Sequence, residues 1–379
     1  MMPERCKIAL FSTSFLPYSQ TFIYDEIRSH SENYHVEVFC KERLNSDRFP
    51  YPHFNKPPKI FEFLYENIAY WPSFKKKIQQ EKFDLVHAHF GTGAVYTLPY
   101  VKKFNLPLVV TFHGYDVSDL MGINRFTPKR WRYNLKAPSI FKHASLLLAA
   151  SEELRAMLIE LGAPKEKVKV YRLGIDLDRF SYEEPSPQKS PVSFVMVGRF
   201  TKKKGHIYAL KALKKVLDEG FDANLSFIGS GSLEDELRQF VIENNMADKV
   251  HFKGILTADE VADELKKADV LLAPSLVPAS YDRESGLIVV KEASATGRPV
   301  IGTWHGGIHE IISEGETGFL VPERNVPELA DRMIRLIKDP EMRLNFGKAG
   351  RARMEREYDL KKQVKELESH YEAVLSANS

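Results

Sequence analysis

Cysteine is scarce in this sequence. The chain has 379 residues and two cysteines, Cys6 and Cys40, both within apolar stretches. So few cysteines exclude a disulfide framework, and neither has neighbours at the spacing of a metal site. We therefore expect two buried thiols in a reducing compartment, with the cytoplasm as the location.

An excess of charge and long apolar runs are also missing. Lys and Arg number 54 and Asp and Glu number 51, which leaves a formal charge of +3. This balance does not predict a nucleic-acid partner, although it leaves room for a local basic patch near an anionic ligand or membrane. No apolar run is long enough to span a bilayer, and we expect no secretory signal in the first residues.

The dinucleotide-binding motif G-x-G-x-x-G is not found after the first expected strand. The nearest candidate, "FIGSGSLEDE", offers Gly229 and Gly231 but has Glu234 in place of the third glycine. Close approach of the backbone to a pyrophosphate depends on these glycines. A dinucleotide-dependent oxidoreductase is therefore a weak alternative.

Apolar strand-like runs alternate with helical stretches along the whole chain. The expected strands are 6–12, 35–41, 83–90, 106–114 and 144–151 in the first half, and 192–200, 223–231, 249–256, 268–276 and 298–307 in the second. This rhythm is typical of parallel sheets covered by helices, and it breaks only at 171–191, where we place a linker. We expect an α/β protein with two Rossmann-like domains at 1–180 and 181–358, and a last helix at 359–379.

The first strand of the second half leads into "VGRFTKKKG". Gly198 ends the strand, Arg199 follows at once, and Lys204 and Gly205 precede the next helix. Two cations around a strand-to-helix turn can converge on one dianionic group, and such turns commonly hold phosphates. The alternative is a solvated turn, which suits the intervening Lys202 and Lys203. We favour the phosphate interpretation.

Two carboxylates frame the segment "ESGLIVVKE". Glu284 falls in the loop after an expected strand, and Glu292 falls inside the helix that begins near Leu287. Eight helical steps span about 12 Å, whereas glycosidase carboxylate pairs need about 5 to 9.5 Å. The spacing therefore suits an elongated ligand with a hydroxyl-rich sugar at each end, because a carboxylate accepts hydrogen bonds from adjacent hydroxyls. The alternative is a half-buried helix with two solvated ends.

The backbone amides of Ser285, Gly286 and Leu287 lie between these carboxylates, where the helix is expected to begin. At a helix N-terminus such amides face anions. A cation pair together with a sugar–phosphate–sugar order of groups describes a nucleotide sugar.

Several motifs, taken in order, carry a family resemblance. "GRFTKKKG", "ESGLIVVKEA", "HGGIHEII", "TFHGYD" and "LGIDLDRF" together resemble the retaining GT-B glycosyltransferases of family GT4, over nearly the whole chain. The opening "FLPYSQTFI" resembles the bacterial exopolysaccharide and lipopolysaccharide branch. The resemblance implies two Rossmann-like domains, a cleft between them, and a C-terminal helix that crosses back to the first domain.

The resemblance also implies roles for the residues of the donor site. Arg199 and Lys204 would hold the donor diphosphate, Glu292 would bind the ribose hydroxyls, and Glu284 would lie near the donor sugar. His113, at a strand end in the first domain, would face the transferred sugar. These roles agree with the interpretation from spacing for all but His113, since a lone histidine is more often structural.

Acceptor contacts and the base pocket are expected on other loops. Many family members have a Gly-Gly pair after the first strand, but here Ser19 and Gln20 stand in that loop, which favours acceptor contacts. Tyr115 and Asp116 follow His113 and are also expected on the acceptor side, while Ile255 is expected near the base.

The resemblance further concerns the cleft floor and the reaction. Gly306, Gly307 and Glu310 are expected to shape the floor, with Glu310 either structural or ligand-binding. The implied reaction transfers a hexosyl group, with retention, from a UDP-, GDP- or ADP-sugar to a sugar or lipid-linked oligosaccharide. No D-x-D metal-binding signature stands where a GT-A enzyme needs one. We therefore expect neither a metal ion nor a cofactor.

Two stretches interrupt the alternating pattern, 51–83 and 127–136, and both combine aromatic with basic residues. Phe61, Phe63, Tyr65, Tyr70, Trp71 and Phe74 are followed by Lys75, Lys76 and Lys77. Local packing under a basic edge and peripheral contact with an anionic membrane are both open interpretations.

Two rival functions also stay open: a nucleotide-sugar epimerase of similar fold, and a non-catalytic carbohydrate-binding subunit.

Overall fold

A computed structural model describes residues 5–17, 20–62, 64, 69–121, 127, 130–185, 190–278 and 283–378. The chain forms two compact units, one of Met1–Gly174 with Leu360–Ser379 and one of Ile175–Asp359. The boundaries expected from the sequence, 180/181 and 358/359, lie within a few residues of these. We call the two parts the N-terminal unit and the C-terminal unit.

The N-terminal unit is built on a seven-stranded parallel sheet of order β3-β2-β1-β4-β5-β6-β7. Its central strands β4 and β5 are buried along their whole length, because helices cover both faces of a parallel sheet. The strands are β1 (Cys6–Phe15), β2 (Tyr34–Arg43), β3 (Phe54–Asn55), β4 (Leu85–His89), β5 (Leu108–Phe112), β6 (Leu146–Ala149) and β7 (Val168–Val170).

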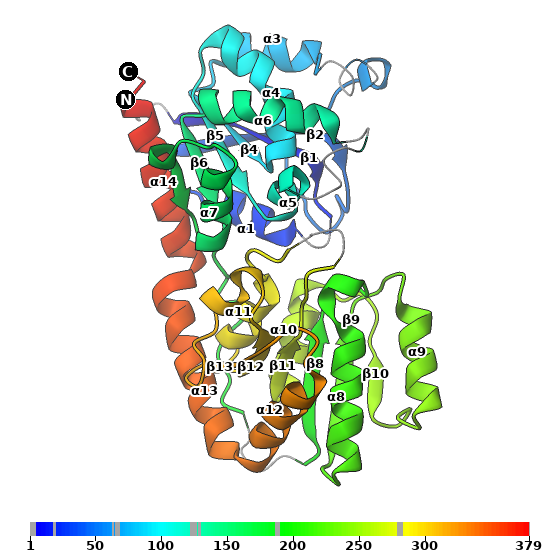
Figure 1. The fold of residues 1–379 in the computed structure, drawn as a ribbon. Helices are drawn as coiled ribbons and strands as arrows, with labels where there is room; N and C mark the ends of the chain where they lie inside the picture. Colours follow the sequence, from blue (N-terminus) through cyan, green and yellow to red (C-terminus); the bar gives the residue numbers. More distant parts are fainter. Residues whose placement is uncertain are drawn as a thin grey trace. The chain divides into compact units, whose positions relative to one another are not determined.

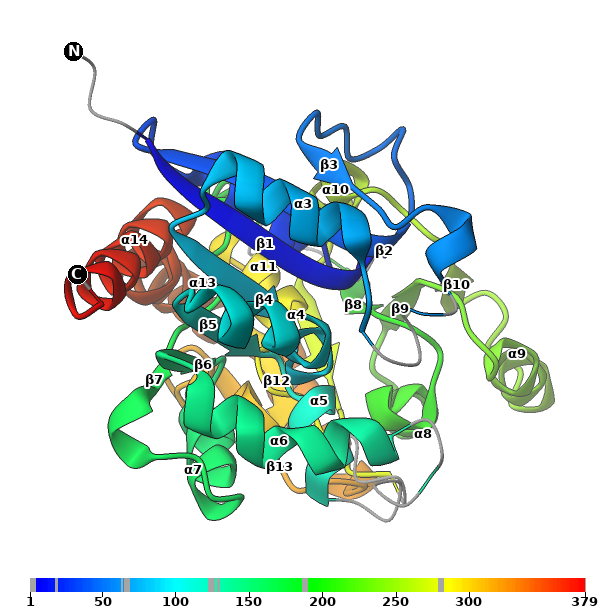
Figure 2. The ribbon, with the colours of Figure 1, turned by 90° about the horizontal axis from the view of Figure 1, so that it is seen from above.

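Helices cover this sheet on two sides. They are α1 (Thr21–Ser29), η2 (Lys59–Phe61), α3 (Pro72–Glu81), α4 (Gly91–Phe104), α5 (Tyr115–Met121), α6 (Trp131–His143), α7 (Glu152–Glu160), η4 (Lys165–Lys167) and α14 (Leu360–Ser376). Figures 1 and 2 show α3 and α4 over one face, and Figure 1 shows α1 on the other.

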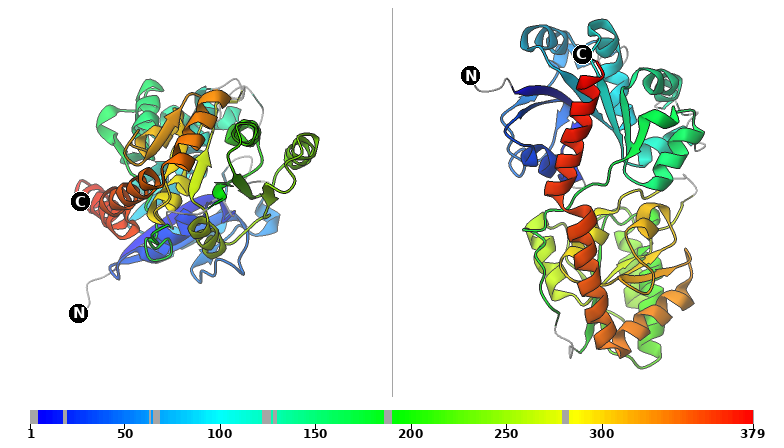
Figure 3. Two further views of the ribbon diagram at one scale, coloured as in Figure 1. Left: turned by 90° about the horizontal axis from the view of Figure 1, so that it is seen from below. Right: turned by 90° about the vertical axis from the view of Figure 1, so that its left-hand side faces the viewer.

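The last helix of the chain, α14, belongs to the N-terminal unit. It packs against α1 and runs along the sheet in red in Figure 3. Its Tyr371 is fully buried and lies 2.7 Å, hydroxyl to Nδ1, from His87 of β4. Glu368 accepts a hydrogen bond from the backbone N–H of Ser31 at 2.7 Å. The expected return of the C-terminal helix is therefore confirmed.

Two residues of the aromatic stretch, at the start of α3, belong to the core. Trp71 and Phe74 are each 1% exposed and pack edge-on against Phe39 of β2. Lys77 pairs with Glu37 in β2. For these residues the membrane interpretation is wrong and local packing is correct, because α3 needs an apolar face to cover the sheet. Phe63 and Tyr65 lie outside the described residues.

The C-terminal unit has a six-stranded parallel sheet of order β10-β9-β8-β11-β12-β13. Its strands are β8 (Val192–Val197), β9 (Ala223–Ile228), β10 (Val250–Phe252), β11 (Val270–Ala273), β12 (Val300–Thr303) and β13 (Gly318–Val321). Its helices are η5 (Lys202–Lys204), α8 (His206–Asp218), α9 (Glu234–Glu243), α10 (Ala258–Lys267), α11 (Ile288–Ala295), η6 (Gly306–Glu310), α12 (Val326–Lys338), α13 (Pro340–Arg353) and the π-helix η7 (Met354–Tyr358).

Two separate cores stabilise the C-terminal unit, one on each side of the sheet. Leu210 of α8 and Met333 of α12 belong to one cluster, together with Phe227 of β9. Leu265 of α10 and Val290 of α11 belong to the other. The sheet is thus covered by helices on both faces, as the alternating sequence pattern predicts.

The strand order of each sheet reverses once beside its first strand. In the N-terminal unit the reversal lies between β1 and β4, and in the C-terminal unit it lies between β8 and β11. Open α/β sheets bind ligands beyond the carboxyl ends of the strands at such a point. The loops after β4, β5, β8 and β11 are therefore the first places to look for a site. Within the described parts of the chain, no helix combines the length and the apolar character that crossing a membrane requires.

Candidate functional site

The loops that follow β8 and β11 meet in the C-terminal unit. Lys204 Nζ lies 2.8 Å from Glu284 Oε1, and Lys203 Nζ lies 3.7 Å from the same oxygen. The three side chains are only 11 to 14% exposed. Lys204, predicted to bind the diphosphate, and Glu284, predicted to lie near the donor sugar, are thus direct partners. The solvated-turn interpretation is wrong for Lys203, whereas Lys202 is exposed as it requires.

Two glycines make this close packing possible. The backbone of Gly205 has φ +76°, and a Cβ there would lie 2.0 Å from the carbonyl oxygen of Pro274 in the loop after β11. Gly198 has φ +153°, and its missing side chain leaves room for the stem of Lys204, whose Cε would lie 3.3 Å from a Cβ. A side chain at either position would move the loop or the lysine.

Two opposing effects set the pKa of Glu284. Burial alone would raise the pKa of Glu284, but the ammonium groups of Lys204 and Lys203 lower this pKa to about 2. The carboxyl group is therefore ionised over the physiological range. The turn η5 and Glu284 form a nearly buried cluster with a surplus of positive charge, which suits an anionic ligand.

Arg199 has a different environment from Lys204. Its side chain is exposed, and among the described residues it makes no hydrogen bond or ion pair. The convergence of Arg199 and Lys204 on one diphosphate stays a prediction. Arg199 is left available for a ligand at the carboxyl end of β8.

The segment after Glu284 leads into α11 as the sequence predicts. Ser285 and Leu287 are buried, α11 begins at Ile288, and Glu292 lies half-buried within the helix. Gly286 is partly exposed between them. The contacts of the three amides with phosphate, and of Glu292 with a ribose, stay predictions. The same holds for Ile255 and a base, although its 53% exposed side chain is accessible in the loop after β10.

His305 and Glu323 complete this region, and sequence reasoning did not find them. The backbone N–H of Glu284 donates to His305 Nε2 at 3.1 Å. His305 Nδ1 lies 2.7 Å from Glu323 Oε1, and Glu323 Oε2 accepts from the backbone N–H of Val277 at 3.0 Å. The only signal in the sequence is a histidine directly before the Gly306-Gly307 pair.

The glycine pair holds the backbone of Glu284 from the other side. Gly306 has φ +51°, and a Cβ there would lie 1.8 Å from the carbonyl oxygen of Glu284. The N–H of Gly307 donates to this oxygen at 3.1 Å. Both glycines thus shape the wall behind Glu284, in agreement with a role in forming the site.

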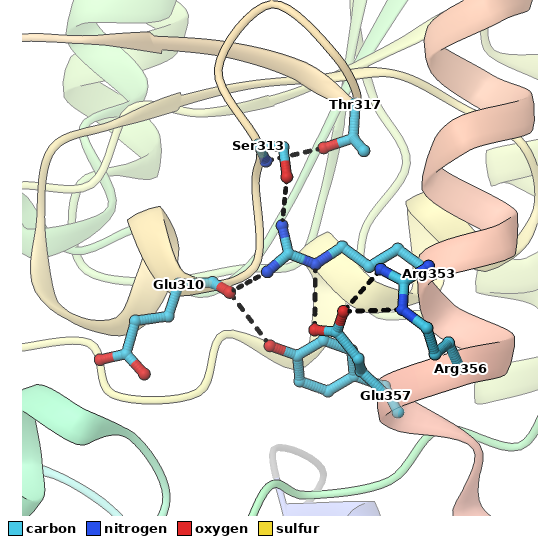
Figure 4. Close-up of polar contacts among 7 residues, drawn as sticks. Glu310, Ser313, Thr317, Arg353, Arg356 and Glu357 are labelled. Atoms are coloured by element: carbon cyan, nitrogen blue, oxygen red, sulfur yellow. Dashed lines mark hydrogen bonds and ion pairs between the residues drawn. The ribbon is translucent and has the colours of Figure 1, made fainter.

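Glu310, at the end of η6, takes part in a structural contact through its backbone. Its carbonyl oxygen accepts from Arg353 Nη2 at 2.8 Å and from the Tyr358 hydroxyl at 3.1 Å. Figure 4 shows its carboxylate pointing away from this arginine-rich cluster. The carbonyl joins η6 to α13 and η7, and whether the carboxylate binds a ligand is left as predicted.

His113 follows β5 in the N-terminal unit and lies in a chain of buried polar groups. Its Nε2 is 3.1 Å from His89 Nδ1, and His89 Nε2 is 3.3 Å from Glu26 Oε1. The Tyr171 hydroxyl donates to Glu26 Oε2 at 2.9 Å. Burial, together with the neighbouring His89, holds the pKa of His113 well below its ordinary value. The imidazole of His113 is therefore neutral and can donate or accept a hydrogen bond.

Asp116 fixes the loop that carries His113. Its Oδ1 accepts from the backbone N–H groups of His113 at 3.1 Å and Gly114 at 2.9 Å, and its Oδ2 accepts from Gly91 at 2.8 Å. Burial raises the pKa of Asp116 to about 6, although these donors oppose the rise. The observed contacts of Asp116 are structural, and acceptor binding by this residue stays a prediction.

The other acceptor-side predictions have mixed outcomes. Tyr115 is 39% exposed and so accessible to a ligand. Gln20 is half-buried just before α1, and Ser19 lies outside the described residues.

Among the residues that the structure describes, two groups of side chains have the composition of a metal site, namely Glu26 with His87 and His89, and His35 with Glu37 and His53. In the first, both ring nitrogens of His87 lie 2.7 Å from hydroxyl groups, those of Tyr371 and Thr111. In the second, Lys77 and Asn55 bind the Glu37 carboxylate. Internal partners thus account for these contacts without a cation.

The whole fold has clear relatives among solved structures. The *Anabaena* protein Alr3699/HepE, solved in complex with UDP, aligns with a TM-score of 0.78 at 18% identity, over 97% of this chain and 99% of that one. Sucrose-phosphate synthase from *Thermosynechococcus elongatus* aligns with a TM-score of 0.77 at 21% identity, over 98% and 100%. With two parallel Rossmann-like sheets, the chain therefore has the GT-B fold.

The family follows from the sequence comparisons. The model described as Glycosyltransferase Family 4 matches residues 19–179, and the model described as Glycosyl transferases group 1 matches residues 178–353. The amylovoran biosynthesis glycosyltransferase AmsK of *Erwinia amylovora* is 31% identical over 278 residues, which are 73% of this chain and 67% of AmsK. The chain belongs to glycosyltransferase family 4, as its motifs predict.

A further relative is the putative colanic acid biosynthesis glycosyltransferase WcaL of *Escherichia coli* K12. It is 32% identical over 253 residues, which are 66% of this chain. The match spans 60% of the length of WcaL.

Proposed function

We propose that this protein transfers a hexosyl group from a nucleotide diphosphate sugar to a hydroxyl acceptor, with retention at the anomeric carbon. The Lys204–Glu284 pair at the strand reversal between β8 and β11 is the observation that carries this proposal. It puts a cation for the diphosphate beside a carboxylate for sugar hydroxyls, in a chain of family 4. AmsK and WcaL, with amylovoran and colanic acid in their names, favour a role in bacterial surface polysaccharide assembly.

The C-terminal unit contains the residues proposed to hold the diphosphate and the ribose of the donor, together with Glu284. Arg199 and Lys204 bind the diphosphate, Glu284 faces the sugar, and Glu292 binds the ribose. UDP is the first nucleotide to test, because HepE was solved with UDP and with UDP-glucose. GDP and ADP are the alternatives.

Binding of the donor changes the partner of Lys204. Without a ligand its ammonium group pairs with Glu284, and Lys203 is a second cation near the same oxygen. A diphosphate can take Lys204, while Lys203 continues to neutralise Glu284. As the bond to the sugar breaks, negative charge grows on the phosphate, and Lys204 with Arg199 stabilises this charge more strongly than the ground state.

The proposed chemistry is a front-face displacement. The acceptor hydroxyl attacks the anomeric carbon on the side from which the diphosphate leaves, and the departing phosphate oxygen takes the hydroxyl proton. The neutral His113 is the proposed contact to the transferred sugar. The lysine and arginine cations supply the charge stabilisation that a metal ion provides elsewhere, so transfer is proposed to need no metal.

A donor screen tests the proposal directly. The wild-type protein is mixed with UDP-, GDP- and ADP-sugars, and thermal stabilisation and nucleotide release are measured. We expect one nucleotide class to stabilise the protein and NAD to have no effect. Undiminished release in the presence of EDTA supports metal independence, and an α-linked product from an α-linked donor, determined by NMR, supports retention.

Product analysis with and without acceptor separates the rival functions. A glycosyltransferase forms a new glycoside only when acceptor is present. An epimerase converts the donor without any acceptor, and a carbohydrate-binding subunit leaves the donor unchanged. Either of the last two results contradicts the proposal.

A lipid-linked acceptor is proposed because one face of α6 is apolar and basic. Trp131 is 56% and Leu135 is 66% exposed one turn apart, and Lys136 beside them is also exposed. Such a face suits the headgroup layer of an anionic membrane. Sedimentation with phosphatidylglycerol vesicles should fall in the variant Trp131→Ser/Leu135→Ser, whereas equal sedimentation of both proteins contradicts membrane contact by this face.

A further inference from the structure

We infer that His305 and Glu323 are positioning residues, which lock the backbone of Glu284 so that its carboxylate meets the donor sugar in one orientation. The inference rests on the proposed function for the role of Glu284. We call the set of contacts that fixes this backbone the lock, and it rests only on three loops, those after β11, β12 and β13. Neither residue needs to touch the substrate.

The direction of each hydrogen bond in the lock follows from its first donor. A backbone N–H can only donate, and the N–H of Glu284 points to His305 Nε2 at 3.1 Å. His305 Nε2 must therefore present a lone pair. In a neutral imidazole the proton is then on Nδ1, which lies 2.7 Å from Glu323 Oε1. His305 thus accepts from the backbone N–H of Glu284 on one side and donates to the carboxylate of Glu323 on the other.

Glu323 must accept hydrogen bonds on both of its oxygens at once. Its Oε1 takes the proton of His305 Nδ1, and its Oε2 takes the backbone N–H of Val277 at 3.0 Å and Arg324 Nη1 at 3.2 Å. Only a carboxylate offers an acceptor oxygen in both directions. An amide of the same shape has one oxygen and one NH2 group, so one of the two donors would face another donor.

The centre of the lock is protected from solvent, and the lock continues on the far side of Glu284. The side chain of His305 is 1% exposed, so water cannot easily replace its partners. The carbonyl oxygen of Glu284 accepts from the N–H of Gly307 at 3.1 Å. Both polar groups of the Glu284 backbone are thus fixed, and the carboxylate is directed at Lys204, 2.8 Å away.

The variant Glu323→Gln tests the lock with almost no change in shape. The single amide oxygen of the glutamine can accept from Val277 or from His305, but not from both. If the NH2 group faces His305 Nδ1, the imidazole proton moves to Nε2, where it faces the N–H of Glu284. We expect kcat to fall about 10- to 100-fold, in the range for lost orientation of a catalytic contact. Binding of the free nucleotide diphosphate that stabilises the wild type should change less than about threefold, because the lock acts on the sugar end. Glu323→Asp keeps both oxygens and should retain more activity than Glu323→Gln.

The tautomer of His305 gives a readout that does not depend on activity. In full-length protein with ring-15N histidine, the His305 signals are assigned by their loss in His305→Asn. We expect the Nδ1–H form in the wild type and loss of that form in Glu323→Gln. Glu316→Gln, which changes an exposed carboxylate in the turn before β13, is the matched control and should match the wild type in both measurements.

The outcomes separate this inference from the proposed function. An Nε2–H form of His305 in the wild type overturns the lock, and so does Glu323→Gln with an unchanged tautomer and kcat. Should Glu323→Gln fail to fold, the wild-type tautomer decides alone. If the wild type shows the Nδ1–H form but turns over no nucleotide sugar, the lock stands and the proposed function fails.

Discussion

Lys204 Nζ lies 2.8 Å from Glu284 Oε1, and the two residues come from loops after different strands. The pair is nearly buried, so each charge depends on the other for compensation. Removing one partner of such a pair leaves a charge in a site with little water, which costs more than a surface ion pair contributes. The same pair brings together the groups that we propose for the diphosphate and for the sugar of the donor.

The variant Lys204→Ala should lower kcat/KM for the sugar nucleotide about 10²- to 10³-fold, the range for the loss of one charge-stabilising donor. The reason is that Lys204 has no substitute at the diphosphate, since Lys203 lies 3.7 Å from Glu284 and stays engaged there. Steady-state kinetics of the purified variant measure the effect. Lys202→Ala, in the same turn but exposed, is the control and should match the wild type. Unchanged kinetics in Lys204→Ala contradict the diphosphate assignment.

The Glu284 carboxylate should make folding stability depend on pH in the acidic range. Its pKa in the folded protein is about 2, below the ordinary 4.5, because Lys204 and Lys203 oppose the effect of burial. Stability from this group is complete above pH 4.5 and is lost as the pH falls toward 2. The shift corresponds to about 3 kcal/mol.

Urea denaturation of the wild type and Glu284→Gln between pH 3 and 7 checks this dependence. The difference in free energy of unfolding should be largest at neutral pH and should shrink below pH 4.5. A difference that is constant over the whole range means that Glu284 does not carry the charge described here.

Gly306→Ala should disrupt the site more than an equal change at Gly315. Both glycines have positive φ, +51° and +74°, but a Cβ at Gly306 would lie 1.8 Å from the carbonyl of Glu284, whereas no atom lies within 4 Å at Gly315. Gly315→Ala should cost about 1 kcal/mol of backbone strain. Gly306→Ala should cost more and also lower kcat. Thermal melts and kinetics of both variants provide the comparison, and equal effects would refute the role of this contact.

Glu26→Gln should destabilise the N-terminal unit by about 1 to 3 kcal/mol. Glu26 accepts from the Tyr171 hydroxyl at 2.9 Å and lies 3.3 Å from His89 Nε2, so an amide would turn a donor toward one of them. The measurement is the urea midpoint of the full chain. Glu32→Gln, at an exposed position after α1, is the control. A midpoint equal to that of the control shows that the buried chain to His113 does not depend on the carboxylate.

The longer strands were predictable because each is a short apolar run bounded by polar turns. "LVVTF" of β5 and "VSFVMV" of β8 are clear examples. The strands β3, β7 and β13 were not predicted, although β10, with three residues, was found within a longer run of the sequence. The helix from Ile288 was found because Glu284, Ser285 and Gly286 mark its start.

The partners within the site were less predictable. Charge and spacing singled out Lys204 and Glu284 as site residues. They did not predict that the two side chains pair with each other or that Lys203 lies close to the same carboxylate. The contact of His305 with Glu323 joins loops after β12 and β13, so no local pattern records it. The sequence left the place of Trp71 and Phe74 open for a similar reason. Aromatic residues followed by lysines occur both at membrane surfaces and in helices that cover a sheet, and the local sequence is the same in the two cases.

The place of Tyr371 has a consequence for how the chain folds during synthesis. This residue, near the end of the chain, fills the interior beside His87, which leaves the ribosome far earlier. The N-terminal unit therefore cannot complete its core until all of residues 175–359 have been translated. A stalled or truncated chain that stops before α14 leaves uncovered the apolar surface that Val364, Leu367 and Tyr371 pack against, which makes such fragments ready targets for chaperones and proteases.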